Sequence, residues 1–144
     1  MNPDQTNTKA VGPFPVFAGE DLTAARSRLC VLTHDTNVPE IKLPTADTDD
    51  AIFQVQEGVA DTALDSAERF APHREFRVPL KGACVPGGRL VLADAGTAAD
   101  KGKLRAVPAA AGTYTVRAIA REVGVDTQHV LVEAVSPFTV TVAG

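Results

Sequence analysis

The side chains that most often carry catalysis are scattered along this chain. The three histidines, His34, His73 and His129, lie far apart in the sequence and in different expected elements. His34 is followed by Asp35, but a catalytic triad needs side chains that converge in space, which adjacency alone does not provide. No serine lies in a G-x-S-x-G turn, and no glycine-rich loop carries the lysine of a P-loop. We therefore predict no catalytic and no cofactor-binding residue, and we expect that the protein is not an enzyme.

Metal binding is suggested only by the acidic segment 47–50. Asp47, Asp49 and Asp50 resemble the start of a calcium loop, because alternate carboxylates can converge on one hard cation. The glycine and the distal glutamate of an EF-hand are missing, however. The segment is predicted to be a solvated turn, and no metal site is predicted.

The two cysteines, Cys30 and Cys84, lie in apolar segments typical of strands. Neither belongs to a C-x-x-C motif or has a neighbouring histidine, so zinc or redox chemistry has little support. Both are interpreted as small buried hydrophobic residues. A disulfide between them stays open, because two cysteines without a secretory signal do not establish one.

The composition limits the classes of partner. At 144 residues the chain is expected to form one domain with a real core, and its 44% hydrophobic and 22% charged residues are ordinary for a folded protein. The net charge is -4 and no lysine or arginine cluster occurs, which disfavours nucleic acid as a partner. No apolar stretch suits a signal peptide or a membrane span, so we expect no membrane partner and folding in a cytoplasm.

The elements that would position a site repeat along the chain. The segment Arg28-Leu29-Cys30-Val31-Leu32 returns as Arg89-Leu90-Val91-Leu92, and a short apolar run ending in Pro44 returns as one ending in Pro108. An alternating segment follows in each half, at 52–55 and at 114–119. The offset stays at about sixty residues, which indicates a duplicated supersecondary unit. We place two pseudo-repeats, at about 18–81 and 82–144, within a single β domain that spans 18–144.

Alternation with a period of two indicates that both halves are built from strands. The clearest case is 112–122, with Tyr114, Val116, Ala118 and Ala120 on one face and Thr115, Arg117, Ile119 and Arg121 on the other. Further strands are expected at 28–33, 40–43, 51–57, 75–81, 128–134 and 137–142. The ten prolines and eleven glycines suit short strands and tight turns. The predicted fold class is all-β, a small β-barrel or β-sandwich of short antiparallel strands with at most one short helix.

Three segments lack a clear strand pattern. Residues 19–26 are expected to hold one turn of helix capped by Asp21. Residues 62–72 are expected to form a loop with a helical turn, because their apolar side chains fall roughly on one helical face but the segment is short. Residues 94–103 carry no packing signal and are expected to be exposed.

The N-terminal segment 1–17 is expected to be an extended arm outside the β domain. Residues 1–10 are polar, whereas 11–17 combine apolar side chains that favour burial with two prolines that block a helix or a central strand. Such a segment either folds against its own body or packs on a neighbouring subunit or another protein. We predict the second, with Val11, Phe14, Pro15, Val16 and Phe17 as the protein-interaction residues.

The order of these elements resembles that of the bacteriophage head decoration (capsid cement) proteins. In the first half the likeness rests on 18–22 leading into 28–32, and on 58–60 after a strand. In the second half it rests on 85–92, 111–116 and the strand around Val130. The likeness covers roughly 18–142 and consists of a recurring order of glycine, hydrophobic strand, polar turn and small-residue strand.

This resemblance implies a structural virion protein. Such a protein would be a homotrimer on the outer surface of the capsid, where it binds the major capsid protein and stabilises contacts between neighbouring capsid subunits. It would be assembled in the host cytoplasm and would need no cofactor. The acidic net charge and the lack of a basic patch suit an outer face, away from packaged DNA.

Two other classes of function are weighed against this one. A small trimeric β-fold enzyme of the nucleotide hydrolase type would need metal-binding and uracil-recognising motifs, and the sequence contains neither. A carbohydrate-binding or adhesin module usually stacks sugars on exposed aromatic rings. The chain has no tryptophan and a single tyrosine, Tyr114, which falls in a strong strand and is interpreted as a core residue.

Overall fold

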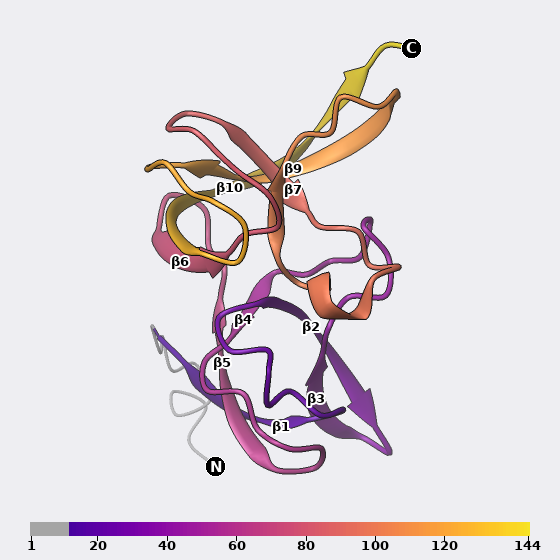
Figure 1. The fold of residues 1–144 in the computed structure, drawn as a ribbon. Coiled ribbons are helices and arrows are strands. Elements are labelled where there is room, and N and C mark those ends of the chain that lie inside the picture. The colour runs from indigo at the N-terminus through magenta and orange to yellow at the C-terminus, as the bar shows by residue number, and fades with distance from the viewer. Residues whose placement is uncertain (1–11) are drawn as a thin grey trace, which may run out of the picture.

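The computed structural model describes residues 12–144, and its regular secondary structure consists almost entirely of β-strands, which form two lobes (Figure 1). The first lobe consists of β1 (Phe14–Ala18), β2 (Leu29–Asp35), β3 (Val38–Lys42), β4 (Phe53–Val55) and β5 (Leu64–Arg69). The second consists of β6 (Glu75–Pro79), β7 (Arg89–Leu92), β8 (Leu104–Ala106), β9 (Gly112–Ala120) and β10 (His129–Val142), with a short 3-10 helix, η2 (Ala98–Asp100), between β7 and β8. The all-β prediction is confirmed. No helix in residues 12–144 is long and apolar enough to cross a membrane.

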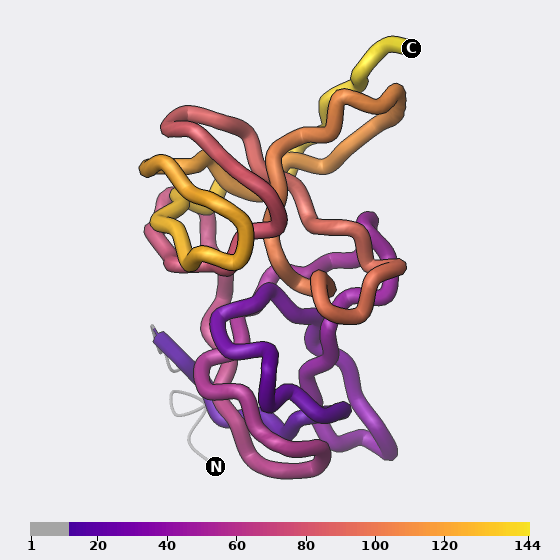
Figure 2. Tube along the Cα trace, in the orientation of Figure 1, coloured from indigo at the N-terminus to yellow at the C-terminus, as the bar shows by residue number. Residues whose placement is uncertain are grey.

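The first lobe is a closed barrel with the strand order β1-β3-β2-β4-β5. Its pairs are antiparallel except for β1 and β3, which run parallel. The second lobe is a five-stranded sheet with the order β6-β10-β9-β7-β8. Leu80, directly after β6, forms an isolated parallel bridge with Leu104 of β8, so this sheet comes close to closing in the same way. The chain completes the first lobe before it enters the second (Figure 2).

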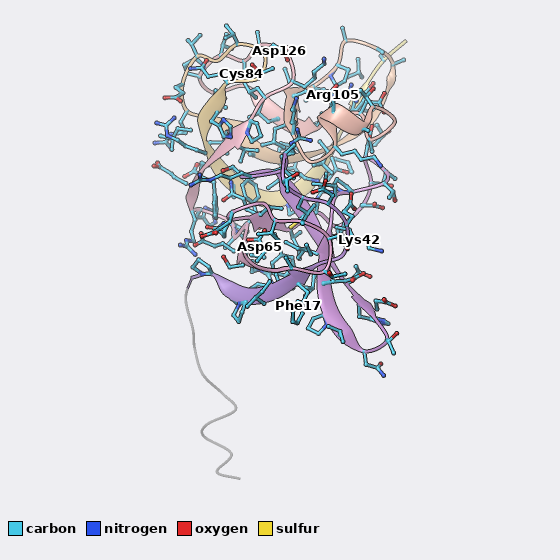
Figure 3. All side chains as sticks on the ribbon, turned by 60° about the horizontal axis from the view of Figure 1, so that its bottom comes forward. Phe17, Lys42, Asp65, Cys84, Arg105 and Asp126 are labelled. Carbon is cyan, nitrogen blue, oxygen red and sulfur yellow. The ribbon has the colours of Figure 1, made fainter. Side chains whose placement is uncertain are left out.

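Of the two hydrophobic clusters, one lies inside the barrel and the other is shared by the two lobes. A single cluster of buried side chains joins Leu29 and Phe70 of the first lobe to Leu80 and Leu104 of the second. Backbone contacts cross the same junction, because the amide of Leu29 donates to the carbonyl of Gly102 over 2.8 Å. Figure 3 shows side chains filling the space between the ribbons of both lobes. The halves therefore pack as one body.

A buried glutamine fastens the junction. The Nε2 atom of Gln54, on β4, donates to the carbonyl of Ser27 at 3.0 Å and to that of Arg77, on β6, at 2.7 Å. Both donor positions of this amide are thus used, as a buried polar group requires.

Residues 14–17 belong to the barrel and do not form the expected separate arm. Strand β1 pairs with β5 from Phe14 opposite Ala67 to Phe17 opposite Leu64, and with β3 on its other side. Val16 is only 2% exposed and lies in the barrel core. The prolines are compatible with this strand because Pro15 lies on its exposed face and β1 meets β3 only at its last two residues.

Two expected helical turns are absent. The segment 62–72 contains β5, which is paired with β1 on one side and with β4 on the other, so its backbone groups are satisfied within a sheet. Its weak helical pattern is overridden by this tertiary pairing. Residues 19–26 form turns, in which the carboxylate of Asp21 accepts a hydrogen bond from the amide of Thr23 at 3.1 Å.

The loop 94–103 was expected to be exposed, which is correct only in part: Asp94 and residues 96–99 are exposed, whereas other residues of the loop pack against the first lobe. Ala95, Asp100 and Lys103 are all buried. The ammonium of Lys103 lies 3.1 Å from the carboxylate of Asp100, and Lys81 lies 3.4 Å from the same group. A run of charged and small residues suggested solvent exposure, but the charges of Asp100 and Lys103 pair with each other at buried positions.

Candidate interaction surfaces

The predicted interaction residues divide between the two faces of β1. Phe14 and Val16 point into the barrel, where the ring of Phe14 meets that of Phe53 edge-on at a centroid distance of 5.5 Å. Pro15 and Phe17 point outward. Val11 lies outside the described residues. Of the set that the structure describes, Phe17 is the large apolar side chain available to a partner, with 42% of its surface exposed.

Phe17 forms a surface patch with two residues that the sequence did not single out. Leu64 on β5 lies directly opposite Phe17 in the register, and Val38 lies two residues before Glu40, the neighbour of Phe17 on β3. Leu64 is 58% and Val38 44% exposed. We call Phe17, Val38 and Leu64 the barrel patch. Their proximity arises from pairing between distant strands, and no local pattern in the sequence reports it.

A shallow groove of about 370 Å³ runs beside the barrel patch. It is lined by Phe17, Ala18, Val38 and Thr62, with the carboxylates of Asp35 and Glu40 among its walls. Lys42 lies 3.3 Å from Glu40 and partly neutralises it. The groove can accept an apolar side chain that is accompanied by a hydrogen-bond donor or a cation, which is a chemistry typical of protein–protein contacts.

A second apolar surface lies on the loops of the second lobe. Val85, Val123 and Val125 are even more exposed than the barrel patch, and we call them the loop patch. They are held together because Cys84 and Gly124 exchange two backbone hydrogen bonds, of 3.0 and 3.1 Å. An apolar groove of about 480 Å³ extends from Val85 and is lined also by Ala83, Leu90, Val107, Val140 and Val142.

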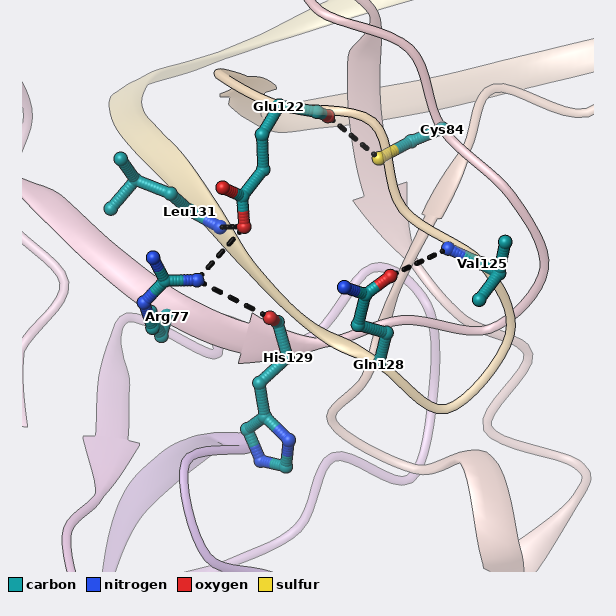
Figure 4. A network of polar contacts seen from close by, with 7 residues as sticks. All are labelled: Arg77, Cys84, Glu122, Val125, Gln128, His129 and Leu131. Carbon is teal, nitrogen blue, oxygen red and sulfur yellow. Dashed lines mark hydrogen bonds and ion pairs between the residues drawn. The ribbon is translucent and has the colours of Figure 1, made fainter.

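A polar network makes the loop patch rigid (Figure 4). The carboxylate of Glu122 accepts hydrogen bonds from the amide of Leu131 at 2.9 Å and from the guanidinium of Arg77 at 2.8 Å. The hydrogen bond from the backbone amide of Leu131 lowers the pKa of Glu122 most, and the hydrogen bond and charge of Arg77 lower it further, so that it lies below its ordinary value. The side chain of Gln128 accepts from the amide of Val125 at 3.1 Å. The valines are thus presented on a fixed backbone.

The residues considered for catalysis or metal binding remain apart. His34 lies near the end of β2, His73 in the turn before β6, and His129 at the start of β10. Within residues 12–144, no three histidine, cysteine, aspartate or glutamate side chains are close enough together to hold a metal ion.

The carboxylates of the acidic segment are used within the fold. Asp49 accepts hydrogen bonds from the amides of Thr45 and Ala46, at 2.8 and 3.2 Å. Asp47 accepts from the amide of Ala95 at 3.0 Å and lies 3.5 Å from Arg105. The segment is therefore a turn, as predicted. It is not only solvated, however, because Asp47 connects it to Ala95 and Arg105 of the second lobe.

Both cysteines are buried free thiols. Burial strongly raises the pKa of the Cys30 thiol, and the charge of nearby Asp65 adds to this effect. Burial also raises the pKa of Cys84, although the amide of Gly124 acts in the opposite direction. A raised pKa disfavours the reactive thiolate. The question of a disulfide, which the sequence left open, is resolved in favour of two separate thiols.

Comparison with known proteins gives an informative likeness among the solved structures. No protein-family model matches the chain, and no curated protein matches its sequence. Among solved structures, the fold is similar to the N base of the head fiber gp8.5 in bacteriophage phi29, with a TM-score of 0.64. The two share 16% sequence identity over 85% of this chain and 92% of that chain. At this level of identity the likeness establishes a common fold over nearly the whole length of both chains.

Proposed function

We propose that this protein is a structural component of a phage virion, a decoration or cement protein that binds the outer surface of the head. The observation that carries the proposal is the fold, which is shared with a head fiber base over 85% of the chain. The order of elements in the sequence supports the same function independently, through its resemblance to head decoration proteins.

The partner in this proposal is the major capsid protein, and the contact is made by the barrel patch. Phe17, Val38 and Leu64 offer an exposed apolar surface on paired strands, which hold their backbone in place. Apolar side chains that protrude from a rigid frame are typical anchors of protein interfaces. The groove beside them supplies polar groups for the rim of the contact.

A protein that binds only the assembled shell stabilises that shell by mass action. Many copies on one head multiply a modest single-site affinity, and a homotrimer gains further by engaging several capsid subunits at once. We propose that the protein acts as a homotrimer, made in the host cytoplasm and located on the outer face of the virion. Light scattering in solution should then give three times the 15.0 kDa mass of the chain.

The direct test is co-sedimentation with heads of the phage that encodes the protein, prepared without it. Saturable binding that raises the temperature at which the heads dissociate is the expected result. A folded protein that stays in the supernatant at every concentration would contradict the proposal.

A further inference from the structure

Arg117 occupies an irregular position in β9. On one side of this strand, Leu90 and Val91 of β7 lie opposite Ala118 and Val116, so no β7 residue lies opposite Arg117. On the other side, the pairing with β10 jumps from Ala134 to Phe138. Such bulges redirect a side chain from its regular face. Arg117 was expected on the outer, polar face of its strand, but it is only 3% exposed.

The buried guanidinium of Arg117 lacks a full set of partners. One of its terminal nitrogens donates to the backbone carbonyl of Asp49 at 2.6 Å. Its Nε atom is buried and has no hydrogen-bond partner among the described residues. No carboxylate in residues 12–144 lies within 4.0 Å of its nitrogens to form an ion pair. A buried charge with an unused donor is costly, and an additional acceptor close to this guanidinium would reduce that cost.

The nearest carboxylates do not fill this role. Burial lowers the pKa of Arg117, and the charges of Asp50 and Asp49 oppose that effect from beyond ion-pair distance. The carboxylate of Asp49 already accepts from Thr45 and Ala46. These groups attract the guanidinium without satisfying its Nε atom.

A cavity of about 200 Å³ adjoins Arg117 at the junction of the lobes. Arg69, at the end of β5, lines the same cavity, as do Phe70, Pro72 and the bulged residues Ser136 and Pro137. Arg69 is exposed and has no ion pair within the described part of the chain. The space exceeds that of several water molecules, about 30 Å³ each. Two arginines, a serine and several apolar residues therefore line one small space.

We infer that this cavity is a binding site for a small oxyanion, a carboxylate or phosphate group held between Arg117 and Arg69. Guanidinium groups present paired donors that match the geometry of these anions. The anion would be either the side-chain carboxylate of a partner protein or free inorganic phosphate. The inference stands apart from the proposed role on the phage head, because it rests on the two arginines and the bulge alone.

The test follows the Nε–Hε signal of Arg117 by NMR during titration at constant ionic strength. One series uses sodium phosphate, and another uses N-acetyl-aspartate as a mimic of a protein carboxylate. A saturable shift of the signal in either series is the expected result. Tighter binding of N-acetyl-aspartate would identify a protein carboxylate as the ligand, and tighter binding of phosphate would identify the free ion.

Two matched variants make the test specific. Arg69→Gln removes an exposed lining guanidinium and should weaken anion binding by about tenfold, the effect of one charge-assisted contact. Arg26→Gln removes an exposed arginine that does not line the cavity, and should leave the affinity within about twofold. A shift that does not saturate with either anion, or an equal loss in both variants, would overturn the inference.

Discussion

Thr62 and Thr127 occupy the same position in two copies of one backbone turn. Thr62 has a φ of 67° and Thr127 a φ of 68°, both in the left-handed region. The amide of Thr62 donates to the carbonyl of Ala18 at 3.0 Å, and that of Thr127 to the carbonyl of Leu80 at 2.9 Å. In each lobe the turn thus closes onto the residue at the end of the first strand.

The same correspondence extends through both sheets. Ala18 lies parallel to Ile41, as Leu80 does to Leu104. The strand neighbours match as well: β2 lies between β3 and β4 in the first lobe, and β7 between β8 and β9 in the second. The offset of about sixty residues noted in the sequence therefore accompanies a repeated topology, but the second copy begins with β6 and not at residue 82, because Glu75–Pro79 belongs to the second sheet.

The shared turn leads to a first prediction about stability. Thr62→Gly and Thr127→Gly should each raise the free energy of unfolding by up to about 1 kcal/mol. A left-handed backbone costs about 1–2 kcal/mol in a residue with a Cβ atom, and glycine avoids this cost. Part of the gain is lost because glycine gives up more conformational entropy on folding. Urea denaturation measures the change. Thr139→Gly, in the extended strand β10, should instead destabilise the protein. Loss of stability in both turn variants would show that the turns are not strained.

Asp65 marks a difference between the two copies and gives a second prediction. Its buried carboxylate accepts from the amides of Glu57, Gly58 and Ser66, at 3.2, 3.0 and 2.6 Å, whereas Val130 lies at the equivalent place in β10. Asp65→Ala should cost about 1–3 kcal/mol, because it leaves these partly buried amides without their acceptor. Asp65→Asn, which keeps one acceptor oxygen, should cost less. Denaturation of both variants checks this order, and an alanine variant as stable as the wild type would refute it.

A third prediction concerns the thiols. Because burial raises the pKa of both, native protein should react slowly with iodoacetamide, and Cys84, which lines a groove, should react before the fully enclosed Cys30. In denaturant both should be modified at once, as mass spectrometry of the intact chain would record. A protein that takes up no label in denaturant would instead contain a disulfide.

The fourth prediction concerns acid. Burial raises the pKa of Asp100, but the hydrogen bond and charge of Lys103, aided by Lys81, outweigh it and hold the pKa below its ordinary value. The resulting stabilisation is complete above the unfolded-state pKa of about 3.9 and is lost as the pH falls through the lower folded-state value. The Asp100→Asn variant should have a lower free energy of unfolding than the wild type at pH 7, and this free energy should fall less on acidification.

Urea denaturation at about pH 7 and pH 3 measures this difference, since the first pH lies above and the second below the ordinary aspartate pKa. The control is Asp61→Asn, at an exposed residue with no ion pair in the part of the chain that is described. Equal acid sensitivity of Asp100→Asn and the wild type would contradict the assignment.

The strands and the repeat could be predicted from the sequence because both are local patterns. Alternation located β9 and β6 nearly to the residue, and the recurrence of Arg28–Leu32 at Arg89–Leu92 anticipated the equivalence of β2 and β7. These signals survive because each strand has one buried face.

The surfaces depended on pairings that a single sequence does not report. The prolines of β1 suggested a free arm, yet pairing with β5 placed Val16 in the core and left Phe17 beside Leu64. Likewise, alternation put Arg117 on the outer face, and only the register shifts on both sides of β9 bury it. Register between distant strands decides which side chains meet.

The fifth prediction separates the two apolar surfaces. Phe17→Ser combined with Leu64→Ser should weaken binding to heads by about tenfold or more, since exposed anchors on one patch carry most of the energy of an interface. Val123→Ser, a similarly exposed change on the loop patch, should have little effect. Co-sedimentation with wild-type protein as the reference measures both. If Val123→Ser weakened binding and the double variant did not, the loop patch and not the barrel patch would contact the shell.

The central claim, attachment to the outside of a phage head, is tested most directly by electron cryomicroscopy of heads incubated with the purified protein. The expected result is added density on the outer surface, at sites where neighbouring capsid subunits meet, into which three copies of the two-lobed fold can be placed. Heads without added density at saturating protein, or density confined to their interior, would contradict it.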